Sequence, residues 1–142
     1  MIELQRKPLW ISEFHALIDE IRRQPFDWQG HDCVLGLGAR TVQALTGVRF
    51  GEEYADQFSD AASAYRLIRK LGFDDIADLL ANYLPEYNHP SESQMGDIVT
   101  IPVDTQFKHS LGVVNGERVI TMTETGIGTV DRLSADRAFR VG

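Results

Sequence analysis

Cys33 and His109 are the two residues whose types and positions could do chemistry together. Cys33 is the only cysteine among 142 residues, and it follows Asp32 where a loop punctuated by Pro and Gly changes to a helical pattern. Aspartate is a favourable N-cap residue, so Cys33 is expected to be the first helical residue, where the helix dipole favours a thiolate. A thiolate nucleophile also needs a base within hydrogen-bond distance. The pair therefore predicts thiol-dependent acyl chemistry, provided that the fold brings the two side chains together.

A purely structural role accounts for the same residues. A single cysteine is most often a buried, inert apolar side chain, and a helix N-terminus supplies no base. Asp32 is a helix cap in either case. His31 would point away from the thiol two residues along the chain, and His89 lies in a loop beside Pro90. We therefore expect both of these histidines to be solvated surface residues.

Composition narrows the class of protein. The length fits one domain over residues 1–142, and 14 Lys and Arg against 21 Asp and Glu give a net charge of −7. Such a charge argues against a nucleic-acid partner. The N-terminal sequence MIELQRKPLW has no signal-peptide layout, and no apolar run reaches the length of a membrane span. We expect a protein made in the cytoplasm without membrane insertion, without a disulfide or a cysteine-based zinc site, and without a cofactor or metal.

Helical periodicity dominates the first 85 residues. Apolar side chains recur at helical spacing from Trp10 to Ile21, and Pro25 ends that pattern. The other predicted helices begin at an N-cap residue and end at Gly or Pro. The four predicted helices are 11–24, 32–46 before Gly47, one capped by Ser59 and closed at Gly72, and one capped by Asp74 and ended at Pro85.

Strand-like sequence follows a loop over residues 85–97 that is rich in Pro, Ser and Asn. Asn115-Gly116 is a strong hairpin signal between two apolar runs. The predicted strands are 98–101, 109–114, 117–122, 126–130 and 138–141. Helices followed by an antiparallel meander predict an α+β fold, with N-terminal helices packed on a C-terminal antiparallel sheet of four to five strands.

Three short motifs stand out: Asp32-Cys33 at a helix start, Gly96-Asp97-Ile98-Val99 at the first strand, and the segment 109–116, HSLGVVNG. They resemble the motifs Asp-Cys-Ser-Gly, Gly-Asp-Leu and His-Val-Gly-Ile of the NlpC-type papain-like cell-wall peptidases. The resemblance implies a papain-like fold in which Cys33 is the nucleophile and His109 the base, with an oxyanion hole that includes the backbone N–H of Cys33. It implies a structural role for Asp97.

Residues 28–33 read Trp-x-Gly-x-Asp-Cys, and residues 140–142 read Arg-Val-Gly. These two motifs more closely resemble those of a small phage-encoded family of unknown function that is found among tail genes. The resemblance spans about residues 12–142. It implies a virion protein whose partners are other phage tail proteins.

The departures from the peptidase motifs concern the catalytic groups. In the family, the histidine lies two residues before the glycine, on the same face of the strand. Here His109 lies three residues before Gly112, and Ser110 takes the equivalent position. Because side chains alternate along a strand, this predicts His109 on the face opposite Gly112, with its imidazole turned away from Cys33. Only a bulge at Ser110 or a frayed start of the strand would turn it back.

Two further positions depart from the family. The residue after the nucleophile is Val34 instead of a small residue, and Leu35 follows it. The third polar residue, which would orient the imidazole, is expected near Thr121, and threonine is a poor orienter of a histidine.

Two functions follow from these observations. The first is a phage virion structural protein of the tail tip or baseplate, made in the host cytoplasm, with a degenerate papain-like hydrolase domain. The second is an active thiol peptidase or amidase of the NlpC type that cleaves peptidoglycan during tail assembly or infection. A weaker third interpretation is an acyl-transfer enzyme on the same scaffold.

Overall fold

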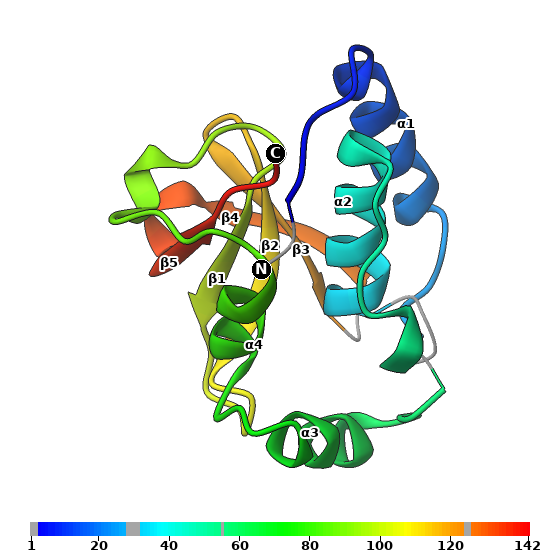
Figure 1. Ribbon diagram of the computed structural model, residues 1–142, viewed down its shortest axis with the longest axis vertical. Coiled ribbons are helices and arrows are strands. Elements are labelled where there is room, and N and C mark those ends of the chain that lie inside the picture. Colours follow the sequence, from blue (N-terminus) through cyan, green and yellow to red (C-terminus); the bar gives the residue numbers. More distant parts are fainter. Residues whose placement is uncertain (1–2, 28–31, 55, 124–125) are drawn as a thin grey trace.

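The computed structural model describes residues 3–27, 32–54, 56–123 and 126–142, apart from the side chains of Cys33 and Thr123. Four α-helices come before the sheet: α1 (Trp10–Arg22), α2 (Ala39–Thr46), α3 (Ala61–Lys70) and α4 (Ile76–Tyr83). Figure 1 shows α1 and α2 side by side, with α4 beside the sheet and α3 at the lower end of the view. The predicted α+β order of helices followed by strands is confirmed.

Five strands form one antiparallel sheet in the order β4-β3-β2-β1-β5. Their bounds are β1 (Ile98–Pro102), β2 (His109–Asn115), β3 (Arg118–Thr123), β4 (Gly126–Asp131) and β5 (Arg137–Phe139). The hairpin between β2 and β3 pairs Asn115 with Arg118, so Gly116 and Glu117 form its two-residue turn. The five predicted strands are confirmed within two residues at their ends.

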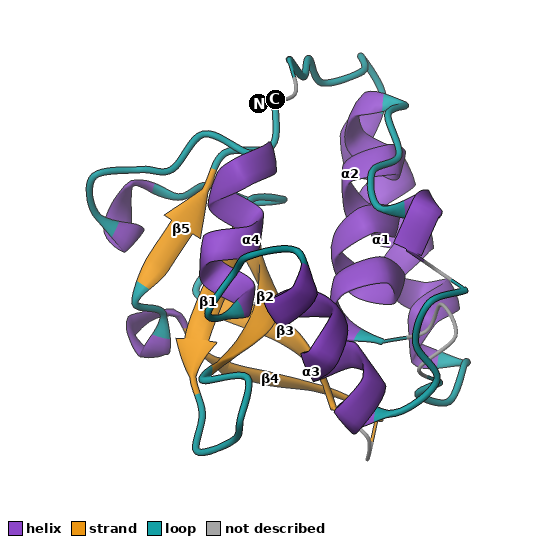
Figure 2. Cartoon of the chain, turned by 60° about the horizontal axis from the view of Figure 1, so that its bottom comes forward, coloured by secondary structure: helices purple, strands orange, loops and turns teal. Residues whose placement is uncertain are grey.

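The sheet has two buried faces of unequal size. Leu111 and Val113 of β2 belong to the large core that also contains the buried residues of α1, α2, α3 and α4. Val114 and Val119 belong to a smaller cluster on the opposite face, against which Tyr87 packs. The helices therefore cover one face of the sheet (Figure 2), and the alternation along β2 decides which side chains meet them.

Two predicted caps are displaced by one residue. Asp60, not Ser59, caps α3. Its side chain accepts from the Ser63 backbone N–H, and the Ser63 hydroxyl accepts from the Asp60 backbone N–H. Asp75, not Asp74, caps α4 by accepting from the Asp78 backbone N–H. In each case both neighbours are acceptable N-cap residues by type, so the local hydrogen bonds decide between them.

The predicted helix 32–46 consists of two kinds of helix. Asp32 caps its start as predicted, and Gly47 ends it with a left-handed φ of 80°. The first six residues, the segment η1 (Cys33–Gly38), form a π-helix, and the Leu37 backbone N–H donates to the Asp32 carbonyl at 2.9 Å. The wider turn separates Cys33 from the regular helix α2, and such π segments are common at functional sites.

A buried carboxylate, Asp97, joins both ends of the described chain to the start of the sheet. Its Oδ1 accepts from the Arg6 guanidinium at 3.0 Å and from the Val141 backbone N–H at 3.0 Å. Its Oδ2 accepts from the Tyr87 hydroxyl at 2.7 Å and from the Gln94 backbone N–H at 2.8 Å. The side chain is 1% exposed. Four donors therefore compensate for the desolvation of one charge.

Arg6 completes this connection. Its Nε donates to the Val141 carbonyl at 2.8 Å, its Nη1 donates to the Met95 carbonyl at 2.8 Å, and its guanidinium lies over the Trp10 ring. Burial, together with the hydrogen bond to Asp97, raises the pKa of Tyr87 to about 12, so this hydroxyl remains a donor at neutral pH. The residues near the C-terminus thus have a structural part in the fold.

We predict that Asp97→Ala lowers the free energy of unfolding by about 3–5 kcal/mol, because it leaves the Arg6 charge and the donors of Tyr87 and Val141 without their acceptor. Urea unfolding measures this change. Asp19→Ala, at an exposed position of α1, is the control and should stay within about 0.5 kcal/mol of the wild type. Equal stability of the two variants would contradict the role given to Asp97.

Candidate functional site

The start of η1 holds a carboxylate that is buried beside Cys33. Asp32 is 3% exposed, and its Oδ2 accepts from the backbone N–H groups of Val34 at 3.2 Å and Leu35 at 3.3 Å. Its Oδ1 has no hydrogen-bond partner among the described residues. Burial raises the pKa of this carboxyl above its ordinary value of 3.8, and the backbone N–H groups oppose that rise.

His109 lies on the face of the sheet opposite Gly112, as its position in the sequence predicted. The register is continuous, with His109 opposite Pro102 and Gly112 opposite Val99. A Cβ on Gly112 would come within 2.4 Å of Val119 in the smaller cluster, which explains why this position needs glycine. By the same alternation, His109 shares the face of Leu111, which the helices cover.

Two carboxylates hold the imidazole of His109. Nε2 lies 2.7 Å from Asp136 Oδ2, and since a carboxylate only accepts, the ring nitrogen donates. Nδ1 lies 3.5 Å from Asp75 Oδ2 and makes no hydrogen bond with any described residue. Asp136 in turn accepts from the hydroxyl of the buried Thr100 at 2.9 Å. The imidazole therefore joins β2 to the residue before β5 by a hydrogen bond, and it lies beside the carboxylate at the N-terminus of α4.

The expected orienting residue near Thr121 is wrong. Thr121 pairs with Gly112, on the face opposite the imidazole, and Asp136 takes the orienting position instead. Asp136 lies 27 residues after His109 in the sequence, so strand spacing around the histidine gives no signal for it. The signal that could have found it is its place directly before the short strand β5, which pairs with β1.

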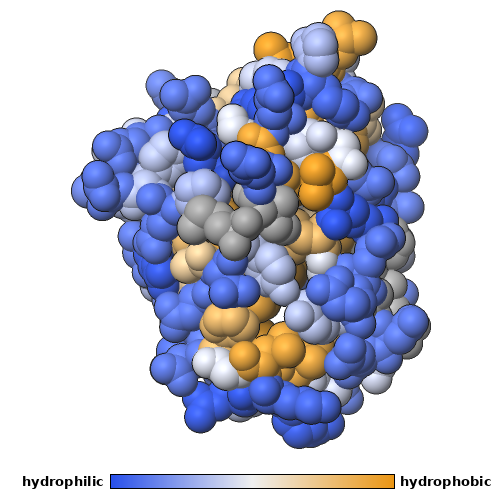
Figure 3. Space-filling model, viewed as in Figure 1, coloured by the Kyte–Doolittle hydropathy of each residue, from blue (hydrophilic) through white to orange (hydrophobic). Residues whose placement is uncertain are grey.

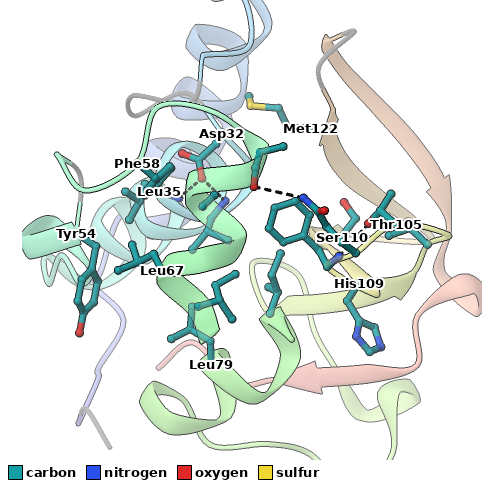
Figure 4. Close-up of a pocket in the computed structure, with 18 of the residues that line it drawn as sticks. Asp32, Leu35, Tyr54, Phe58, Leu67, Leu79, Thr105, His109, Ser110 and Met122 are labelled. Carbon is teal, nitrogen blue, oxygen red and sulfur yellow. Dashed lines mark hydrogen bonds between the residues drawn. The ribbon is translucent and has the colours of Figure 1, made fainter. Parts of the chain in front are cut away.

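An apolar pocket of about 480 Å³ connects these groups. Its walls come from η1, α3, α4, the loop 103–108 and the start of β2, and they include both Asp32 and His109. Leu67 of α3, Leu79 of α4 and Leu35 of η1 are typical of the lining (Figure 4). Figure 3 shows apolar side chains gathered in the lower part of that view, where α3 and α4 lie in Figure 1.

Asp32 and His109 lie at different parts of the pocket. Figure 4 shows the His109 imidazole extending away from Asp32, with Ser110 and Thr105 on the His109 side of the pocket. Asp32 immediately precedes Cys33, whose side chain lies outside the described residues. Among the described groups, the fold thus pairs His109 with Asp75 and Asp136, and it places Asp32 at a different part of the pocket.

His89, another candidate histidine, is not among the described residues that line the pocket. His89 is exposed and caps a three-residue helical turn, where its Nδ1 accepts from the Ser91 backbone N–H at 3.1 Å. The expectation that His89 is a surface histidine is confirmed, while His31 and Trp28 lie outside the described residues. Within the described part of the chain, no group of three or more His, Cys, Asp or Glu side chains could hold a metal ion. No described helix is long and apolar enough to cross a bilayer.

The fold and the site define a class: an α+β domain in which helices cover one face of a five-stranded antiparallel sheet, with a carboxylate-held histidine beside an apolar pocket. Residues 5–141 match the family described as "Domain of unknown function (DUF6950)". The chain belongs to that family. No curated protein and no solved structure matches it.

We predict that His109→Ala lowers the free energy of unfolding by about 1–3 kcal/mol, because the change removes the hydrogen bond from β2 to the residue before β5 and leaves Asp136 Oδ2 without its donor. His15→Ala, at an exposed position of α1, is the matched control and should change stability by less than about 0.5 kcal/mol. Thermal and urea unfolding at neutral pH measure both variants. Equal stability of the two variants would contradict the stabilising role given to the His109 imidazole.

Asp32 predicts a pH-dependent difference between two variants. Its folded-state pKa is raised, so its contribution to stability is fully present below about pH 3.8 and is lost as pH rises through the folded-state pKa. Asn keeps the cap without the charge. The stability of Asp32→Asn relative to wild type should therefore increase as pH rises above 3.8. Urea unfolding between pH 3.5 and 7 measures this trend, and a relative stability that falls with rising pH would contradict it.

Proposed function

We propose that the chain is a structural protein of a phage virion, a tail-tip or baseplate component in which a papain-like domain of the NlpC type no longer acts as a hydrolase. It is made in the host cytoplasm and assembles with other phage tail proteins. The support for the tail role is the resemblance of residues 28–33 and 140–142 to the phage tail family. The support for the loss of hydrolysis is the setting of His109.

The hydrogen bond between His109 and Asp136 supports the proposed loss of hydrolytic activity. With Nε2 donating to Asp136, Nδ1 is the only ring nitrogen left to accept a proton from a thiol. That nitrogen is buried and lies 3.5 Å from the Asp75 carboxylate, and the ring extends away from Asp32 in Figure 4. A general base must be within hydrogen-bond reach of the proton that it takes. The imidazole is instead built into the contact between β2, α4 and the segment before β5.

The pocket agrees with this assignment. Peptide substrates need convergent donors and acceptors to hold the backbone near the nucleophile. Beside the η1 start, the pocket presents aliphatic side chains such as Val34 and Leu35, and the acceptor atoms of Asp32 are occupied by the cap or buried. Such a surface suits packing against apolar groups more than the binding of a polar peptide.

An active thiol peptidase or amidase is the second candidate, because one specific feature favours it. A histidine held by a carboxylate, as His109 is by Asp136, is the base-and-orienter arrangement of cysteine hydrolases. In that mechanism the Cys33 thiolate attacks a peptide carbonyl of peptidoglycan, His109 protonates the leaving amine, and water hydrolyses the thioester. The backbone N–H of Cys33 would contribute to the oxyanion hole.

Two measurements separate the candidates. Purified protein incubated with peptidoglycan fragments should give no cleavage products by mass spectrometry, and iodoacetamide should alkylate Cys33 at a rate close to that of free cysteine. Mass spectrometry of purified virions should find the chain, and virions that carry Cys33→Ala should still assemble. Cleavage that is lost in Cys33→Ala and in Asp136→Ala would overturn the structural assignment in favour of the hydrolase. Absence of the chain from virions would overturn the tail role.

A further inference from the structure

The apolar pocket has the features of a small-molecule site that the tail role does not explain. Its volume of about 480 Å³ lies in the range of ligand pockets, about 300–1,000 Å³. Most of its walls are aliphatic, and they come from elements far apart in the sequence: η1, α3, α4 and the start of β2. An open apolar pocket in water carries a free-energy cost that an apolar ligand removes.

Charge limits the chemistry of the ligand. Asp32 and His109 are the only acidic or basic side chains among the described lining residues. The Asp32 carboxylate is buried, and the His109 imidazole is already flanked by Asp75 and Asp136. No described cation in the lining is therefore left to bind an anionic headgroup, and the nearby carboxylates would repel one.

A neutral hydrogen-bonding group lies at one side of the pocket. Thr105 is on the His109 side in Figure 4, while Leu67 and Leu79 line another part. A hydroxyl can both donate and accept, so this side suits an alcohol, ester or amide group. The aliphatic remainder suits a hydrocarbon chain.

The loop 103–108 forms one wall and connects it to α3. Gln106 Nε2 donates to the Ala61 carbonyl at 3.4 Å, and the Phe107 ring meets the Tyr65 ring edge to face with centroids 6.0 Å apart. Lys108, with a φ of 65°, directs the chain from this loop into β2. Val103, at the start of the loop, lines the pocket and is still 36% exposed, so it stands where the pocket meets solvent.

From these observations we propose that the pocket between η1, α3, α4 and the loop 103–108 binds the aliphatic chain of an uncharged amphiphile, with its polar head beside Thr105. This inference goes beyond the proposed tail role. It concerns binding by the isolated chain and holds whether or not the chain assembles into a virion.

The test uses the uncharged fluorescent probe N-phenyl-1-naphthylamine, with 1-decanol as competitor. The wild-type chain should enhance the probe's emission saturably, and 1-decanol should displace it, while dodecanoate should compete less well. Val103→Trp should fill the mouth of the pocket and weaken binding by about tenfold, which corresponds to about 1.4 kcal/mol. Ala64→Phe, which projects into the pocket from α3, should do the same.

The matched control is Leu133→Trp, which introduces the same aromatic ring at a side chain that is 93% exposed and outside the pocket lining. It should bind the probe like the wild type. Because Val103 and Leu133 are both exposed, neither substitution disturbs the core, and circular dichroism verifies the fold. Absence of saturable binding, or equal affinity of the two Trp variants, would overturn the proposal. Better competition by dodecanoate than by 1-decanol would overturn the assignment of an uncharged head.

Discussion

The buried Asp97 carboxylate is the interaction on which the arrangement of the chain depends. Its two oxygens accept from Arg6, Tyr87, Gln94 and Val141, which come from four separate parts of the sequence. A buried charge is costly unless donors surround it, so the four contacts are needed together. This one side chain thereby fixes the entry into β1, and with it the register of the strand that pairs with both β2 and β5.

The contacts of Asp97 and Arg6 also determine how the backbone of Val141 packs. Val141 has no side-chain polar group, and its backbone takes part twice: its N–H donates to Asp97 and its carbonyl accepts from Arg6. Gly142 has a φ of 80°, and a Cβ there would come within 3.0 Å of the Arg6 backbone nitrogen. The terminal Val-Gly pair is therefore suited to packing against residues near the other end of the chain, which a reading of local motifs cannot reveal.

Much of the fold could be predicted from the sequence, because periodicity and Gly or Pro punctuation act locally. The cap of α3 shows where this stops: Ser59 and Asp60 are equally good by type, and the hydrogen bonds that Ser63 exchanges with Asp60 decide between them. The π-helix at Cys33 was missed for a similar reason. Apolar residues on a helix that is buried all round fit either period, and the observed bond from Leu37 to the Asp32 carbonyl depends on tertiary packing.

The candidate site shows the same division between local and long-range information. Strand alternation correctly put His109 opposite Gly112, but alternation alone cannot say which face the helices cover. The partners of the imidazole, Asp75 and Asp136, lie 34 residues before and 27 residues after it. Only the fold brings them together, because Asp75 is the N-cap of α4 and Asp136 directly precedes β5.

The partners of His109 and Asp32 determine what chemistry these side chains can do. A hydrolase needs its base to face the nucleophile with one nitrogen free, so that a proton can move when the thiol attacks. In this chain, one nitrogen of His109 is hydrogen-bonded to Asp136, and the other lies 3.5 Å from the Asp75 carboxylate. One oxygen of Asp32 accepts from a backbone N–H of η1 as its N-cap. Asp32 and His109, the acidic and basic side chains among the described lining residues, thus both take part in the packing of secondary structure, and an apolar surface lies between them.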